Sequence, residues 1–268
     1  MLALVLHNTK INPFDTLEEA TKLLSVIPQE LADRLILIGG QALLLWGEYY
    51  LIDKLTGKQL ESLASDDLDF MGRKPEVEDC ANAWHGEARI PDIDDHTPQS
   101  GMVFINNEGV KEVIDFLPQV YGISHNDALR FSDRMKFGEN TVRVLSPPLC
   151  LKSRIENLNG LGYGEAKIDR EKVRVTAAIS ACYYYLVDIC DNQISPRTLP
   201  NVVTYMANSI LLSRAAIALS AEYGFDFRDA FPVKKIASVH KEITNKFLKS
   251  MFAKYHEKAE SRKVRRQS

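Results

Sequence analysis

The hydrophobic pattern of the chain changes near residue 145, and this change limits the possible folds more than any other feature. Before it, short apolar runs alternate with amphipathic stretches, and after it the pattern is helical almost throughout. Ser146-Pro147 at the junction is typical of a helix start, with Ser as the N-cap and Pro at the first helical position. We therefore predict an α+β chain with a strand-rich domain over residues 1–145 and a helical domain over residues 146–268.

The expected elements follow from the period of the apolar residues and from the turn residues between them. A first helix has Thr16 as its expected N-cap. Further helices are expected over residues 41–51, about 77–84, 147–159, about 170–190, 199–222 and 233–260. Strands are expected over residues 34–38, 67–71, 102–106 and 112–117, and a further strand from residue 142 leads into the helix that begins at residue 147.

The composition is that of an ordinary globular protein, since 45% of the 268 residues are hydrophobic and 26% are charged. The best membrane-span candidate, residues 209–221, is too short and is interrupted by Arg214. The N-terminus has no basic region typical of a signal peptide, and the four cysteines show no metal-binding or disulfide spacing. We expect a cytoplasmic protein with buried free thiols and no membrane partner.

Two aspartates on one expected strand are the first candidates for chemistry. Asp67 and Asp69 are two residues apart, so their side chains share one face of the strand. Adjacent like charges are costly unless a cation lies between them, and carboxylate oxygens suit Mg²⁺ or Mn²⁺. The alternative is a pair of solvated surface carboxylates.

Asp115 interrupts the otherwise apolar segment 113–117. An unpaired charge buried in such a strand would be expensive, so we consider it a third carboxylate for the same metal ions. The alternative is an edge-strand aspartate that faces water.

Gly39-Gly40 lies between an apolar strand and a helix. Without Cβ atoms the backbone can approach a ligand closely, and the amides at a helix start can bind phosphate oxygens. The alternative is a simple tight turn.

Taken together, these features resemble the DNA-polymerase-β-like nucleotidyltransferase superfamily over roughly residues 30–175. The segment 38–43 (IGGQAL) is similar to its Gly-Gly helix-start motif, and the segment 65–70 (SDDLDF) is similar to its D-x-D motif. Abortive-infection nucleotidyltransferase toxins and their relatives begin with the same Gly-Gly-x-Ala-Leu pattern. The resemblance implies a mixed sheet flanked by helices, followed by a helical bundle, and it implies a toxin or phage-defence role with a cognate antitoxin protein as partner.

The resemblance also implies roles for single residues. Its catalytic and metal-binding residues would be Asp67, Asp69 and Asp115, and its nucleotide contacts would be Gly39, Gly40, Ser65 and Lys152. Lys167 and Asp169 look like a Lys-Asp element before the next helix, although Ile168 separates them. Relatives often carry an Arg four residues before the first aspartate of D-x-D, where this chain has Leu63.

The predicted function is transfer of a nucleoside monophosphate from an NTP such as ATP to a hydroxyl acceptor, with Mg²⁺ or Mn²⁺ as cofactor. The acceptor can be RNA (a tRNA end, for example), a protein or a small molecule. Two alternatives are a non-catalytic nucleotide-binding or interaction module that kept the fold, and a metal-dependent phosphohydrolase.

Charge is distributed unevenly along the chain. The segment 233–268 has eleven Lys and Arg against three Glu, a net charge of +8. Because the whole chain carries −3, the remainder carries −11. A basic tail on an acidic body predicts a polyanionic partner and favours RNA as the acceptor, while a solvated helix face is the alternative.

Overall fold

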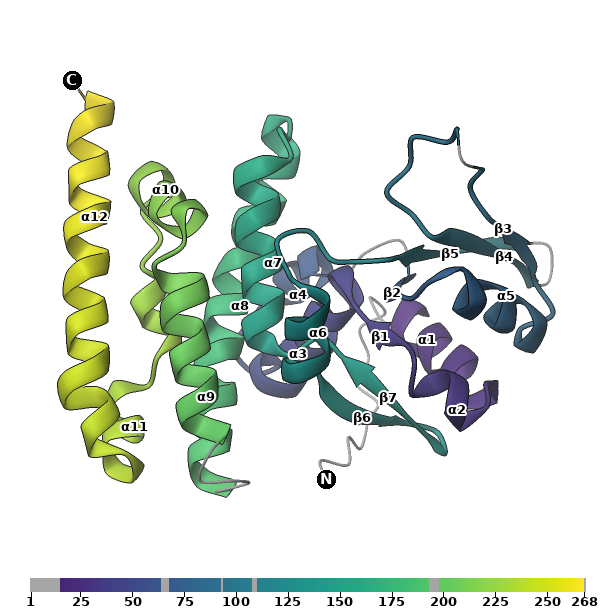
Figure 1. Cartoon of the computed structure of the whole chain (residues 1–268), viewed down its shortest axis with the longest axis horizontal. Helices are drawn as coiled ribbons and strands as arrows, with labels where there is room; N and C mark the ends of the chain where they lie inside the picture. The colour runs from purple at the N-terminus through teal and green to yellow at the C-terminus, as the bar shows by residue number, and fades with distance from the viewer. Residues whose placement is uncertain (1–14, 64–67, 93, 108–109, 193–197, 268) are drawn as a thin grey trace. The chain divides into compact units, whose positions relative to one another are not determined.

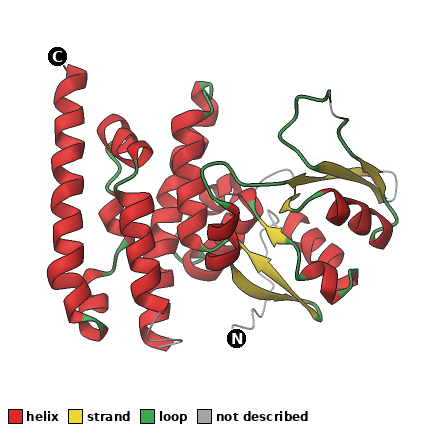
Figure 2. Cartoon of the chain, viewed as in Figure 1, coloured by secondary structure: helices red, strands yellow, loops and turns green. Residues whose placement is uncertain are grey.

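The computed structural model describes residues 15–63, 68–92, 94–107, 110–192 and 198–267. Its contacts divide the chain into two compact units, Met1–Cys150 and Leu151–Ser268. The described strands all belong to the first unit, and the described part of the second unit is helical (Figure 2). The chain is therefore a mixed α/β protein, which agrees with the α+β prediction at the level of fold class.

A seven-stranded mixed sheet forms the centre of the first unit, with the strand order β3-β4-β5-β2-β1-β7-β6. β1 pairs in parallel with β7 and β2 pairs in parallel with β5, while the other neighbours are antiparallel. The strands are β1 (Ile36–Leu37), β2 (Leu68–Met71), β3 (Glu87–Arg89), β4 (Gly101–Asn107), β5 (Val110–Leu117), β6 (Asp133–Phe137) and β7 (Asn140–Val144). The predicted strands at 102–106 and 112–117 are confirmed, and the strand predicted over 34–38 is reduced to Ile36–Leu37.

The helices of the first unit are α1 (Asp15–Val26), α2 (Gln29–Ala32), α3 (Gly39–Leu51), α4 (Gly57–Leu63), α5 (Lys74–Ala83) and α6 (His125–Phe131), and α7 (Pro147–Gly160) continues into the second unit (Figure 1). Of these, α1, α2, α3 and α5 pack against the sheet, and α4 packs against α3. Thr16 lies inside α1, so the prediction of Thr16 as N-cap is wrong. The sequence reasoning missed α4, α6, β3 and β6, which are short and have weak periodicity.

The start of α7 differs from the predicted cap in one respect. Pro147 is the first residue of the helix, as predicted. The hydroxyl of Ser146, however, is buried and has no hydrogen-bond partner among the described residues. Pro148 occupies the second helical position and has no N–H to offer, which removes one of the two usual donors to a capping hydroxyl.

The second unit contains α8 (Glu165–Asn192), α9 (Thr198–Tyr205), the π-helix η1 (Met206–Leu211) and α10 (Arg214–Tyr223). It continues with the 3₁₀ turn η2 (Phe227–Ala230), α11 (Val233–Val239), the π-helix η3 (Ile243–Leu248) and α12 (Lys249–Gln267). The helix predicted over 199–222 is interrupted, because the Ser213 hydroxyl accepts a hydrogen bond from Ala216 N at 3.0 Å and starts a new helix. The basic helix predicted over 233–260 is also divided, at His240, whose backbone is not helical.

The core of the second unit includes one side of α12. Met251, Tyr255 and Ala259, each four residues from the next, are buried. The Tyr255 hydroxyl donates to Phe225 O at 3.1 Å and accepts from Phe227 N at 3.3 Å. The basic residues after position 260, where the predicted helix ends, also belong to α12, which continues to Gln267.

Two expectations about the chain as a whole can be compared with the structure. All four cysteines are free and buried, as predicted. Among the described helices, α8 is long and apolar enough to cross a membrane. The segments α9–η1 and α10 meet the same criteria of length and hydropathy only if they are counted as one span, and the chain bends by 63° between them. Half of the apolar α8 window is buried within the fold, as is usual for a core helix.

Candidate functional site

Asp69 and Asp115 lie opposite each other on neighbouring strands. Asp69 of β2 is the register partner of Asp115 in the parallel pair β2–β5. Register partners on adjacent strands point to the same side of the sheet, with the strands about 4.8 Å apart. Both residues are half-buried, and the Oδ1 atom of Asp115 is buried. The two aspartates that the sequence placed on separate strands are thus brought together.

Aromatic packing on the opposite face of β2 and β5 stabilises this register. Phe70 and Phe116 are fully buried there, with ring centroids 5.8 Å apart. The Trp84 ring, which follows α5, lies 6.3 Å from Phe70 and 6.2 Å from Phe116. Because a slip of one residue would turn these rings toward the aspartate side, the aromatic packing opposes any other pairing of β2 with β5.

Gly39 is the third part of the arrangement. It has a φ of +70°, and a Cβ atom at this position would lie 2.2 Å from Asp69 Oδ2. The backbone is connected as well, since Ile38 N donates to Asp69 O at 3.0 Å. Gly39 and Gly40 are the first two residues of α3, so the predicted tight turn is the first turn of a helix whose start lies against the carboxylate. Glycine at position 39 is therefore required by both conformation and space.

Two predicted site residues, Ser65 and Asp67, lie outside the described residues. Among the described ones, no group of three His, Cys, Asp or Glu could hold a metal ion. The set of three carboxylates, Asp67 with Asp69 and Asp115, accordingly stays a prediction.

Lys152 belongs to the second unit, where its Nζ lies 5.5 Å from the centroid of the Tyr205 ring. Its contact with nucleotide phosphates stays a prediction. Lys167 lies over the Tyr163 ring at 4.7 Å, and Asp169 pairs with Lys172 at 3.0 Å. Both Lys167 and Asp169 are inside α8, so their placement before the helix is wrong.

The sequence reasoning missed two polar residues of α3, Gln41 and Glu48. They are seven residues apart and therefore share one face of the helix. Gln41 is fully buried, and burial raises the pKa of Glu48 to about 7. Within the described part of the chain, the buried Glu48 Oε2 atom has no hydrogen-bond partner. Two polar residues at helical spacing in an otherwise apolar segment were the available signal.

A comparison of the chain with protein-family models, with curated proteins and with solved structures found no match. The chemistry of the chain's own residues is therefore the basis on which a function can be inferred. Carboxylates in register on a sheet, beside the amide-rich start of a helix, can hold a hard cation and a phosphate group near each other.

Proposed function

We propose that the chain is a metal-dependent nucleotidyltransferase that moves a nucleoside monophosphate from an NTP to a hydroxyl acceptor. The observation that carries this proposal is the register of Asp69 with Asp115 beside Gly39. The order of strand, Gly-Gly helix start, D-x-D strand and later aspartate, on which the family resemblance depends, supports it. A nucleotidyltransferase fold for the first unit is part of the same proposal.

The residues fit a divalent ion. Asp69 and Asp115 offer hard oxygen ligands, and two carboxylates on adjacent strands repel each other unless a cation offsets their charge. Asp67, Asp69 and Asp115 would hold Mg²⁺ or Mn²⁺. When bound, such an ion neutralises charge on the triphosphate and lowers the pKa of the acceptor hydroxyl.

The chain's own groups would then bind and orient the reactants. The amides of Gly39 and Gly40, at the start of α3, donate to triphosphate oxygens. Asp115 accepts the proton of the acceptor hydroxyl, whose oxygen forms a bond to the α-phosphorus while the bond between that phosphorus and the bridging oxygen breaks. Pyrophosphate leaves. Ser65 and Lys152 are further nucleotide contacts on the basis of the resemblance.

RNA is the acceptor that the charge of α12 supports. Lys254, Lys258 and Arg265 lie along one exposed side of this helix. Within the same helix, Lys263 pairs with Glu260 at 2.8 Å and Arg266 pairs with Glu222 at 2.7 Å. The exposed side defined by Lys254, Lys258 and Arg265, here called the basic side of α12, suits a phosphate backbone.

The test is a transfer assay with the full chain. Each of the four NTPs, labelled at the α-phosphate, is incubated with Mg²⁺ or Mn²⁺, with and without total tRNA. We expect label in a tRNA product with wild type, none with Asp69→Asn, and wild-type transfer with Glu87→Gln, which changes an exposed carboxylate on β3. NTP binding without transfer to any acceptor would favour the non-catalytic module instead.

The role of RNA has its own test. Reversing two charges on the basic side of α12 (Lys254→Glu with Lys258→Glu) should weaken RNA binding at low salt by about tenfold and reduce its salt dependence. The matched control, Lys54→Glu with Lys58→Glu, makes the same charge change at exposed positions of the first unit. Equal RNA affinity for both double variants would favour a protein or small-molecule acceptor.

A further inference from the structure

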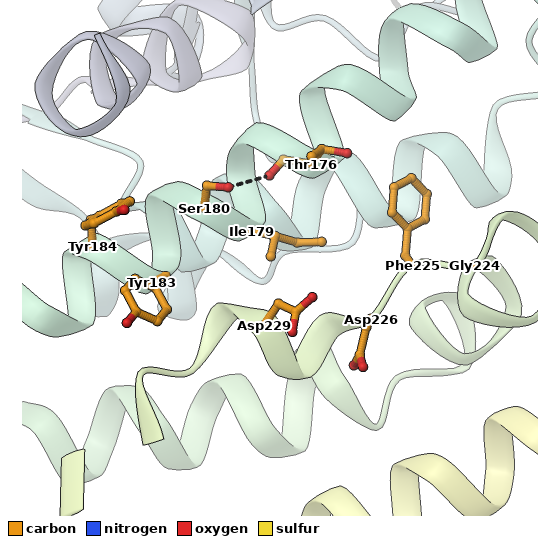
Figure 3. Close-up of a pocket in the computed structure, with 9 residues that line it drawn as sticks. All are labelled: Thr176, Ile179, Ser180, Tyr183, Tyr184, Gly224, Phe225, Asp226 and Asp229. Carbon is orange, nitrogen blue, oxygen red and sulfur yellow. Dashed lines mark hydrogen bonds between the residues drawn. The ribbon is translucent and has the colours of Figure 1, made fainter. Parts of the chain in front are cut away.

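A groove in the second unit lies between α8 and the segment that connects α10 to η2 (Figure 3). Its volume is about 440 Å³, within the range of small-molecule sites. Tyr183, Tyr184 and Ser180 line it from α8, Phe225 and Asp226 line it from the connecting segment, and Asp229 lines it from η2. None of these residues has a role in the proposed transfer.

The two aspartates of the groove differ in their partners. Asp226 is held by Arg228, whose Nε donates to Oδ1 at 2.8 Å, and this lowers the pKa of Asp226. The Asp226 carboxylate points away from α8 in Figure 3. In the described part of the chain, no hydrogen bond or ion pair holds the Asp229 carboxylate. Burial and the neighbouring charge of Asp226 raise the pKa of Asp229, although the nearby Arg228 charge offsets part of this effect.

No cationic side chain lines the groove among the described residues. The nearest basic residues on the same elements are already paired: Arg228 with Asp226, and Lys172 of α8 with Asp169. The two aliphatic hydroxyls keep their lone pairs for the groove, since Ser180 donates its hydrogen to Thr176 O at 3.2 Å and Thr176 donates its hydrogen to Lys172 O at 3.0 Å. The groove therefore carries excess negative charge.

Aromatic rings supply the walls. The Tyr183 and Tyr184 rings meet edge to face with centroids 5.2 Å apart, and Tyr183 is 37% exposed. Phe225 lies 5.8 Å from the ring of Phe227, which anchors it from the core. Ring faces attract cations, and the combination of aromatic walls with a carboxylate is the chemistry that recognises organic ammonium groups.

We propose that this groove binds a small organic ammonium cation, with Asp229 as the counter-charge and Tyr183, Tyr184 and Phe225 as the aromatic wall. The site is separate from the proposed transfer chemistry and needs neither metal nor nucleotide. Because Asp229 and Tyr183 are exposed, the affinity for a simple ammonium ion is modest.

The experiment is an NMR titration of the full chain, without metal or nucleotide. The probes are choline and the neutral alcohol in which a carbon atom replaces the choline nitrogen. These probes have the same shape, so their difference isolates the charge. We expect saturable shifts at Tyr183, Gly224 and Asp229, and about tenfold tighter binding of choline than of the alcohol.

Variants separate the contribution of the Asp229 charge to binding from that of the aromatic wall. Asp229→Asn should weaken choline binding about three- to fivefold and leave the alcohol unchanged, whereas Glu242→Gln, an exposed carboxylate outside the groove, should change neither. Tyr183→Leu should weaken choline more than the alcohol, and it tests the proposal even if Asp229→Asn does not fold. Equal binding of the two probes, no saturable shift, or wild-type choline affinity in the Asp229 variant would overturn the proposal.

Discussion

In the first unit two carboxylates lie in register on neighbouring strands, whereas in the second unit a buried carboxylate lies between two guanidinium groups. Asp69 is opposite Asp115. Glu171, 1% exposed, accepts from Arg174 at 2.7 Å and faces Arg154 at 3.5 Å. Backbone pairing sets the first arrangement, and attraction between opposite charges sets the second. Under the function proposed above, the first arrangement serves a ligand, whereas the second stabilises the fold.

The largest expected effect tests the first half of this comparison. Asp69→Asn should lower the rate of nucleotide transfer by about a thousandfold or more, because it removes a proposed metal ligand. The free energy of unfolding should stay equal or rise, since a like charge is removed beside Asp115. Transfer assays and urea unfolding of the same preparation measure the two quantities. Wild-type turnover would contradict the metal assignment.

The second prediction concerns the second unit, where removal of a carboxylate should lower the stability of the fold. Glu171→Gln leaves Arg154 and Arg174 buried without their counter-charge, so the free energy of unfolding should fall by about 3 kcal/mol. Asp169→Asn, which breaks an exposed pair with Lys172, should cost less than about 1 kcal/mol and serves as the control. If the two variants unfold at the same urea concentration, the buried network does not stabilise the fold as described.

Gly39→Ala should affect both the stability of the fold and the rate of nucleotide transfer. The positive φ and the close approach of Asp69 Oδ2 should together cost about 2 kcal/mol and displace the carboxylate. Gly162 also has a positive φ, +59°, but a Cβ atom added there would have no neighbouring atom within 4 Å, so Gly162→Ala is the control. This control should show the strain without loss of transfer. Equal transfer rates in the two variants would separate Gly39 from the site.

The smallest effect is a pH dependence. Burial raises the pKa of Glu48 to about 7 from its ordinary value of 4.5, so the folded state holds a proton that the unfolded state releases in this window. The contribution of Glu48 to stability is therefore full below pH 4.5 and is lost as the pH rises to 7. Glu48→Gln should be more stable than wild type by about 1 kcal/mol at pH 8, an amount reduced by the partial exposure of the side chain, and equal at pH 4. A pH-independent difference between the two melting curves would show that Glu48 does not titrate in this way.

Elements with strong local signals could be predicted from the amino-acid sequence. The alternation over residues 67–70 indicated β2, the apolar segment 113–117 indicated β5, and the run 147–159 between Pro147 and the glycines indicated α7. The spacing of the cysteines indicated free thiols. Each of these depends on neighbours within one element, where side-chain period and backbone preference act directly.

Contacts between elements that are distant in the sequence could not be predicted in the same way. The pairing of Asp69 with Asp115 joins strands that are far apart in sequence, and aromatic packing on the opposite face selects that register. The same holds for Glu171 with Arg154, which come from different helices. The helix break at Ser213, within the predicted helix 199–222, was also not predicted, because the apolar pattern continues through the serine N-cap. Long-range contacts depend on chain geometry that no local pattern contains, so the sequence named Asp69 and Asp115 as candidates but their register followed only from the pairing of the strands.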